Sequence, residues 1–109
     1  MIATLIAREQ ITVSNSALGL DAGATRINGS TAAIARNKQR FRYADIQVQG
    51  YQVRATFDGS TAPVAATTGE LWSPSSKYRV WGLETALNLQ LIREIASDAT
   101  VVVTYWGER

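Results

Sequence analysis

Residues 45–57, DIQVQGYQVRATF, alternate apolar and polar side chains on either side of one glycine. Ile46 and Val48 are the apolar members before Gly50, and Val53 is among those after it. A period of two is typical of half-buried β-strands, because successive side chains point to opposite faces of a sheet. This stretch therefore predicts two consecutive strands that are separated by a turn at Gly50.

The same period recurs in residues 11–14, 77–81 and 101–106, which are predicted to be strands as well. In residues 101–106, VVVTYW, apolar or bulky side chains occupy both faces, so we expect a strand in the centre of a sheet or against a partner. Few stretches of the sequence place apolar residues at the spacing of a helix. Residues 83–90 are expected to form a short helix or an irregular crossover, although their leucines also fit a strand.

The length of 109 residues fits one domain. Many short strands separated by turn residues predict an all-β fold, a jelly-roll-like β-sandwich of about eight short antiparallel strands over residues 10–109. Residues 1–9 are expected to form an extended N-terminal arm. Its apolar side chains, Ile2, Leu5 and Ile6, are candidate interface residues, because such an arm can add a strand to the sheet edge of a neighbour.

The chain contains no cysteine and no histidine. These absences exclude the usual zinc ligand sets, a thiol nucleophile, a disulfide and a Ser-His-Asp catalytic triad. No catalytic residue, cofactor or metal ligand is predicted, and we expect the chain not to be an enzyme.

Basic residues gather in the first half of the chain, although the formal net charge is only +2. Seven basic and three acidic residues lie up to position 54, and four basic and six acidic residues follow. Spacing of two would place four cations on one face of an extended segment: Arg36, Lys38, Arg40 and Arg42. This basic ladder is either a solvated edge strand or a surface for an anionic partner, with an acidic protein favoured over nucleic acid.

The tryptophans Trp72, Trp81 and Trp106 are the remaining candidate contact residues. Flat rings can stack on sugars, but aromatic residues in strands are more often core or interface anchors. Trp106 stands three residues from the end of the sequence and, if exposed, would be an oligomer or docking contact.

Several short segments together resemble a group of small virion proteins of tailed bacteriophages. The resemblance covers roughly residues 10–105 and is carried by ITVS (11–14), ALGL (17–20), VRATFDGSTAP (53–63), ATTGEL (66–71), IREIA (92–96), DAT (98–100) and the valine-rich run that ends in VTY (103–105). The chain departs from the group in residues 1–7, in the basic ladder and in residues 73–81.

The resemblance implies a β-sandwich that binds other virion proteins and catalyses nothing. Among the roles of that group, a capsid decoration (cement) protein on the exterior of the head is favoured. Its expected partners are the major capsid protein and further copies of the chain as a homo-oligomer, with no nucleic acid and no membrane. The alternatives are a tail or neck component of the virion and a glycan-binding module that uses Trp72, Trp81 or Trp106.

Overall fold

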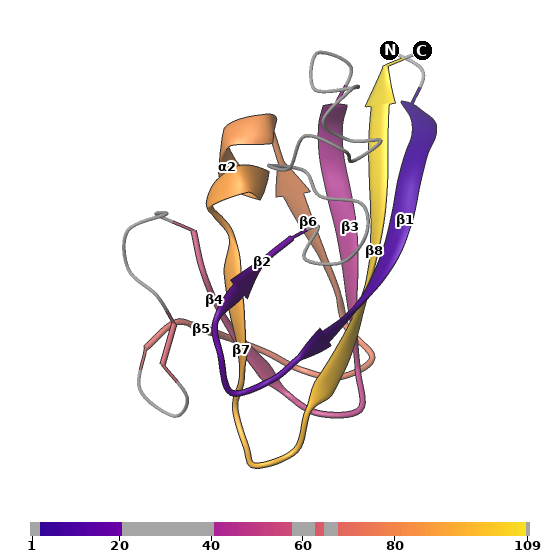
Figure 1. Cartoon of the computed structure of the whole chain (residues 1–109). Helices are drawn as coiled ribbons and strands as arrows, with labels where there is room; N and C mark the ends of the chain where they lie inside the picture. Colours follow the sequence, from indigo (N-terminus) through magenta and orange to yellow (C-terminus); the bar gives the residue numbers. More distant parts are fainter. Residues whose placement is uncertain (1–2, 21–40, 58–62, 65–67, 109) are drawn as a thin grey trace.

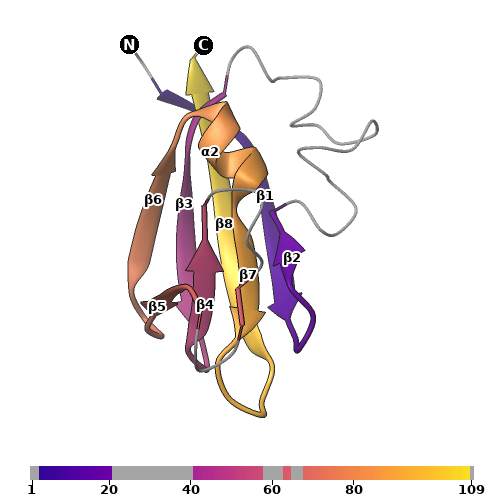
Figure 2. The ribbon, with the colours of Figure 1, turned by 90° about the vertical axis from the view of Figure 1, so that its left-hand side faces the viewer.

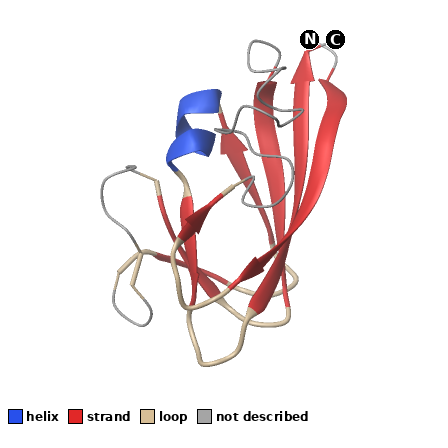
Figure 3. Ribbon diagram, viewed as in Figure 1, coloured by secondary structure: helices blue, strands red, loops and turns tan. Residues whose placement is uncertain are grey.

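The structure is a computed structural model that describes residues 3–20, 41–57, 63–64 and 68–108. Within these ranges the elements follow in the order β1 (Ala3–Val13), β2 (Leu18–Gly19), β3 (Phe41–Gln49), β4 (Val53–Thr56), β5 (Glu70–Trp72), β6 (Lys77–Trp81), α2 (Leu83–Asn88), β7 (Gln90–Arg93) and β8 (Ala99–Glu108) (Figure 1). Strands dominate, and the short helix lies toward one end of the molecule (Figure 3). No helix in the described part is long and apolar enough to span a membrane.

The strands form two four-stranded sheets that lie one behind the other (Figure 2). Sheet A has the order β1-β8-β3-β6, and sheet B has the order β2-β7-β4-β5. Each early strand pairs antiparallel with its counterpart from the other end of the chain: β1 with β8, β2 with β7, β3 with β6 and β4 with β5. A long two-stranded ribbon that folds over on itself gives this order, which is that of a jelly roll. The predicted all-β, jelly-roll-like sandwich is confirmed.

The core lies between the sheets and is built from the inward members of the alternating runs. On β8, Val103 and Tyr105 are fully buried while their neighbours face outward. Ile46 and Val48 of β3 and Val53 of β4 are equally buried, as their alternation predicts. β8 lies between β1 and β3, so the central position predicted from its two apolar faces is confirmed.

The chain changes sheets at Gly50, between the two strands predicted from residues 45–57. Gly50 has a φ of 85°, which a residue without a Cβ atom adopts at little steric cost. β3 and β4 are consecutive in sequence and belong to opposite sheets. Residues 83–88 form α2, so the expected short helix is confirmed, and β7 begins directly after it at Gln90.

The N-terminal arm expected at residues 1–9 differs in the structure. From Ala3 onward these residues belong to β1, which pairs with β8 of the same chain along its length. A register shift between Leu5 and Ala7 interrupts the alternation, and Ile6 packs against the core. This irregularity hides the strand in the sequence, because a β-bulge shifts the inward and outward positions by one residue. Ile2 lies outside the described residues.

Three further strands were not predicted individually. β2 and β5 contain two and three residues, too few to show a period of two, and the four residues of β7, QLIR, place two apolar side chains side by side in the sequence. Their positions follow from pairing with neighbouring strands, as β7 pairs with β4 from Val53 to Thr56. Sheet B is therefore defined by tertiary contacts more than by its own sequence pattern.

Replacing Gly69 by alanine is expected to lower the free energy of unfolding by roughly 1–3 kcal/mol. Gly69 has a φ of 115°, and an added Cβ would lie 3.0 Å from the backbone oxygen of Ala55 in β4. Gly50→Ala is the control, since no atom lies within 4 Å of its added Cβ and only the backbone cost of roughly 1 kcal/mol remains. Urea denaturation measures both variants. Equal losses of unfolding free energy in the two variants would contradict a steric clash between the added Cβ at position 69 and the backbone of Ala55.

Candidate functional site

A row of large side chains crosses the outer face of sheet A. Leu5 of β1 is the direct partner of Trp106 of β8, Trp106 is the partner of Tyr43 of β3, and Tyr43 is the partner of Trp81 of β6. Directly opposed residues on one face of a sheet lie close enough for their side chains to pack. These four side chains, named here the apolar row, therefore span the full width of the sheet.

The apolar row is open to solvent at both ends. Trp81 is 57% exposed and Leu5 is 48% exposed, while Tyr43 and Trp106 are half-buried between them. The Tyr43 ring lies 4.8 Å from the Trp81 ring at 49° and 6.4 Å from the Trp106 ring at 26°. The rings thus form a continuous but uneven surface, not a flat platform.

Arg79 is fixed above this row by two kinds of contact. Its Nε and Nη2 atoms donate hydrogen bonds of 2.8 and 3.2 Å to the two carboxylate oxygens of Asp45. Its guanidinium carbon lies 4.2 Å from the centre of the Tyr43 ring and 5.5 Å from that of Trp81. The hydrogen bond to Asp45 raises the pKa of Arg79, against the lowering by desolvation. Arg79 thus covers part of the Tyr43 face with a planar, permanently charged group.

A groove of about 160 Å³ lies beside the apolar row on the same face. Side chains from all four strands line it: Arg8 of β1, Val102, Thr104 and Trp106 of β8, Asp45 and Gln47 of β3, and Lys77 of β6. Arg8 and Lys77 come from the two edge strands. The groove therefore carries a cation from each side of the sheet.

The structure brings together three of the predicted interface residues, Leu5, Trp81 and Trp106. Trp72 is different, because it is 1% exposed and stacks on Tyr78 at 4.3 Å inside the sandwich. Its prediction as a contact residue is wrong: the inward position on β5 makes this ring part of the core. Ile6 is also turned toward the core.

Only one member of the basic ladder lies within the described residues. Arg42 forms an ion pair of 2.6 Å with Glu108 and donates a hydrogen bond to the carbonyl oxygen of Phe41. The other three members, Arg36, Lys38 and Arg40, lie outside the described residues. A register shift between Phe41 and Tyr43 places Phe41 in the core and Tyr43 on the outer face. Arg42 is thus anchored at this irregularity.

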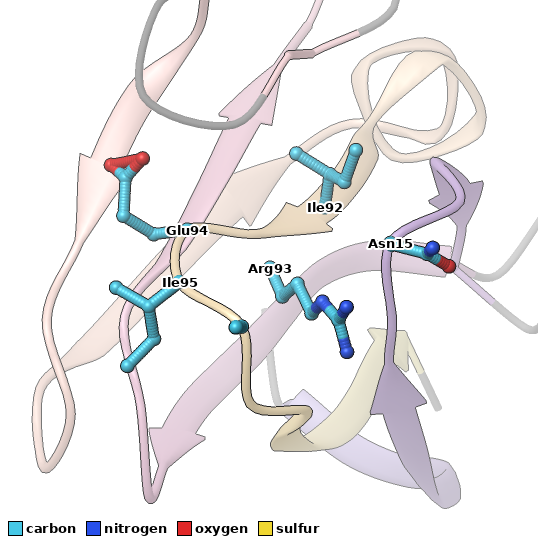
Figure 4. A pocket seen from close by; sticks show the side chains of 6 residues that line it. Asn15, Ile92, Arg93, Glu94 and Ile95 are labelled. Atoms are coloured by element: carbon cyan, nitrogen blue, oxygen red, sulfur yellow. The ribbon is translucent and has the colours of Figure 1, made fainter.

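A second hollow of about 300 Å³ lies at the loop that follows β7, where Asn15, Ile92, Arg93, Glu94 and Ile95 surround it (Figure 4). Its charged groups are engaged by neighbours, since Arg93 pairs with Asp98 at 2.6 Å and Glu94 pairs with Arg54 at 2.7 Å. The lining side chains that are left to contact a ligand are therefore mainly those of Ile92 and Ile95. Among the described residues, no cluster of acidic side chains is suited to hold a metal ion.

Sequence reasoning missed Asp45, Arg79, Arg8 and Lys77 as members of this surface. A signal exists for two of them, because Lys77 and Arg79 share the alternation that places Trp81 on the outer face. The others become neighbours only through strand register, which joins residues far apart in the chain.

Comparison with known proteins adds no relative: no protein-family model, no curated protein and no solved structure matches the chain.

Proposed function

We propose that the chain is a non-enzymatic virion structural protein of a tailed bacteriophage. Its role is that of a capsid decoration protein that binds the major capsid protein on the exterior of the head. The resemblance of residues 10–105 to small phage virion proteins supports the phage assignment. The jelly-roll strand order is compatible with it, because this architecture occurs in viral capsid domains, although it also occurs in lectins and does not by itself define a function.

The observation that carries the binding role is the apolar row on the outer face of sheet A. Tryptophan, tyrosine and arginine are the residues most enriched at the energetic centres of protein interfaces. Trp81, Tyr43, Trp106 and Arg79 lie together there, and Trp81 is largely exposed. Burial of the exposed parts of these rings against a capsid subunit would supply most of the binding free energy, because aromatic side chains and arginine dominate the energetic centres of interfaces.

Decoration would stabilise the shell by linkage. A protein that binds only the assembled shell raises the free energy needed to separate its subunits by RT ln(1 + [L]/Kd) per site, where [L] is its free concentration and Kd its dissociation constant for the shell. Many copies would multiply the effect, and contacts between copies in a homo-oligomer would add to it.

A glycan-binding module is the second candidate, and the exposure of Trp81 favours it. The ring geometry weakens this candidate, since Trp81 is tilted by 49° from Tyr43 and Arg79 covers part of Tyr43. Titration with a panel of oligosaccharides should leave tryptophan fluorescence unchanged. A saturable change that Trp81→Ala abolishes would favour the glycan module.

Cosedimentation with purified phage particles tests the proposal. The chain is expected to sediment with heads that lack it, in a saturable manner and at a fixed ratio to the major capsid protein. Separated tails serve as the comparison. Binding to tails alone would instead assign the chain to the tail or neck, and no binding to either would contradict the proposed function.

A further inference from the structure

The groove beside the apolar row has an excess of positive charge. Arg8 and Lys77 are exposed, and neither forms an ion pair with another described residue. The carboxylate of Asp45, which also lines the groove, is already bound by Arg79. Glu9, next to Arg8, accepts a hydrogen bond from the buried Tyr105. The groove therefore offers two cations to a ligand from outside.

The arrangement of these two cations sets the spacing of a ligand's charges. Arg8 is on β1 and Lys77 is on β6, which are separated by β8 and β3. Three steps between neighbouring strands correspond to roughly 14 Å, and Lys77 is offset by two residues along the strands, because Arg8 stands in the row of Asp45 and Lys77 in the row of Gln47. The two backbones are therefore roughly 16 Å apart, a distance that the long arginine and lysine side chains can shorten. An extended peptide advances by about 3.3 Å per residue, so carboxylates about four residues apart would reach both cations. The side chain midway between them would lie over the central strands, which contribute Val102 and Trp106 to the groove.

The composition of the groove favours a protein ligand over a nucleic acid. Nucleic-acid binding commonly rests on about 6–10 phosphate contacts, and this face offers two unengaged cations among the described residues. An acidic peptide needs fewer cations and gains from the apolar side chains at the centre of the groove.

We propose that this groove binds an acidic, extended segment of the partner protein, with one carboxylate at Arg8, a second about four residues away at Lys77, and an apolar side chain between them against Val102, on the side of the groove that Trp106 closes. This inference rests on the proposed function, because it names the chemistry of the protein that the outer face of sheet A meets. It does not depend on the identity of that protein.

Nuclear magnetic resonance titration of the full chain with three peptides tests the inference. The probes are GEAFAEG, its neutral analogue GQAFAQG and its basic analogue GKAFAKG. GEAFAEG is expected to shift the amide signals of residues 8, 77 and 102–106 and the indole signal of Trp106, and to bind at least fivefold more tightly than GQAFAQG. GKAFAKG should produce no saturable shift.

Charge-removing variants locate the binding. Arg8→Gln and Lys77→Gln are each expected to weaken GEAFAEG binding about threefold, and the double variant about tenfold, which is typical of exposed ion pairs. Arg93→Gln removes the same charge from sheet B and should change the affinity less than about 1.5-fold. Equal binding of the three peptides, or equal losses in Arg93→Gln and the groove variants, would overturn the inference.

Two comparisons separate this inference from the proposed function. Tighter binding of an eight-nucleotide oligothymidylate than of GEAFAEG would overturn the inference in favour of a nucleic acid. If GEAFAEG binds in the groove and phage heads do not bind the chain, the proposed function fails and the inference stands. If heads bind wild type and the double Gln variant equally well and GEAFAEG does not bind, the inference alone fails.

Discussion

Replacing Trp72 by alanine is expected to lower the free energy of unfolding by about 3–5 kcal/mol, which is the usual cost of removing a large buried aromatic side chain. Trp72 enters the core from β5 of sheet B and stacks on Tyr78 of β6 in sheet A, with ring centres 4.3 Å apart and planes 4° from parallel. Phe57 packs on it at 5.9 Å. The ring therefore joins the two sheets.

The loss of a hydrogen bond further lowers the free energy of unfolding of Trp72→Ala. The indole Nε1 of Trp72 donates a hydrogen bond of 2.8 Å to Glu70, and the hydroxyl of its stacking partner Tyr78 accepts one of 2.9 Å from the backbone N–H of Ser73. Removal of the indole thus leaves a cavity, frees the Glu70 carboxylate and loosens the support of the turn after β5.

Equilibrium urea denaturation, followed by circular dichroism, measures this effect. Trp72→Phe should lower the free energy of unfolding less than Trp72→Ala does, because it retains an aromatic ring against Tyr78. Trp81→Ala, a truncation of an exposed tryptophan, should cost less than about 1 kcal/mol. A loss below 1 kcal/mol in Trp72→Ala would show that this ring does not hold the sheets together.

Trp81→Ala is expected to produce the largest loss of binding to phage heads. Truncation of an interface tryptophan at an energetic centre costs about 2 kcal/mol or more, which corresponds to at least roughly a thirtyfold weaker affinity. Trp81 is 57% exposed and contacts Tyr43 and Arg79, so its removal also loosens both neighbours. The same variant should lose less than about 1 kcal/mol of its free energy of unfolding, so it remains folded in the binding assay.

Two exposed apolar residues away from the outer face of sheet A provide matched controls. Tyr51 is 44% exposed in the connection between β3 and β4, and Leu71 is 42% exposed on β5 of sheet B. Tyr51→Ala and Leu71→Ala are expected to bind heads as wild type does in the cosedimentation assay. If Trp81→Ala binds as tightly as these controls, the apolar row is not the docking surface.

Alternation of apolar and polar residues predicted the long strands, because a two-residue period survives wherever a strand is half-buried. Residues 45–57 show it on both sides of Gly50, and residues 101–106 show the two-sided pattern of a central strand. The first strand was missed in part, because residues 8–10 are all polar and the register shift after Leu5 interrupts the alternation before them. Short strands such as β2 depend on their partners and have no pattern of their own.

Several residues of the candidate site could be predicted individually from the sequence, but their assembly into one surface could not. Leu5, Trp81 and Trp106 each stood out by size and position in the sequence. Their assembly into one row follows from the register of β1, β8, β3 and β6, which side-chain periodicity does not specify between strands far apart in the chain. Trp72 is the opposite case, because it was predicted to lie on the surface and is buried in the core. A strand of three residues gives too little pattern to assign its ring to the core.

The attachment of the chain to a capsid through the outer face of sheet A is the central claim, and cryo-electron microscopy of decorated heads tests it most directly. A reconstruction that separates the strands is expected to show the chain on the head exterior, with β1, β8, β3 and β6 facing the shell and atoms of Trp81 within about 4.5 Å of the capsid protein. Heads that carry the chain with sheet B toward the shell and the apolar row in solvent, or heads that carry no copy of it, would contradict the claim.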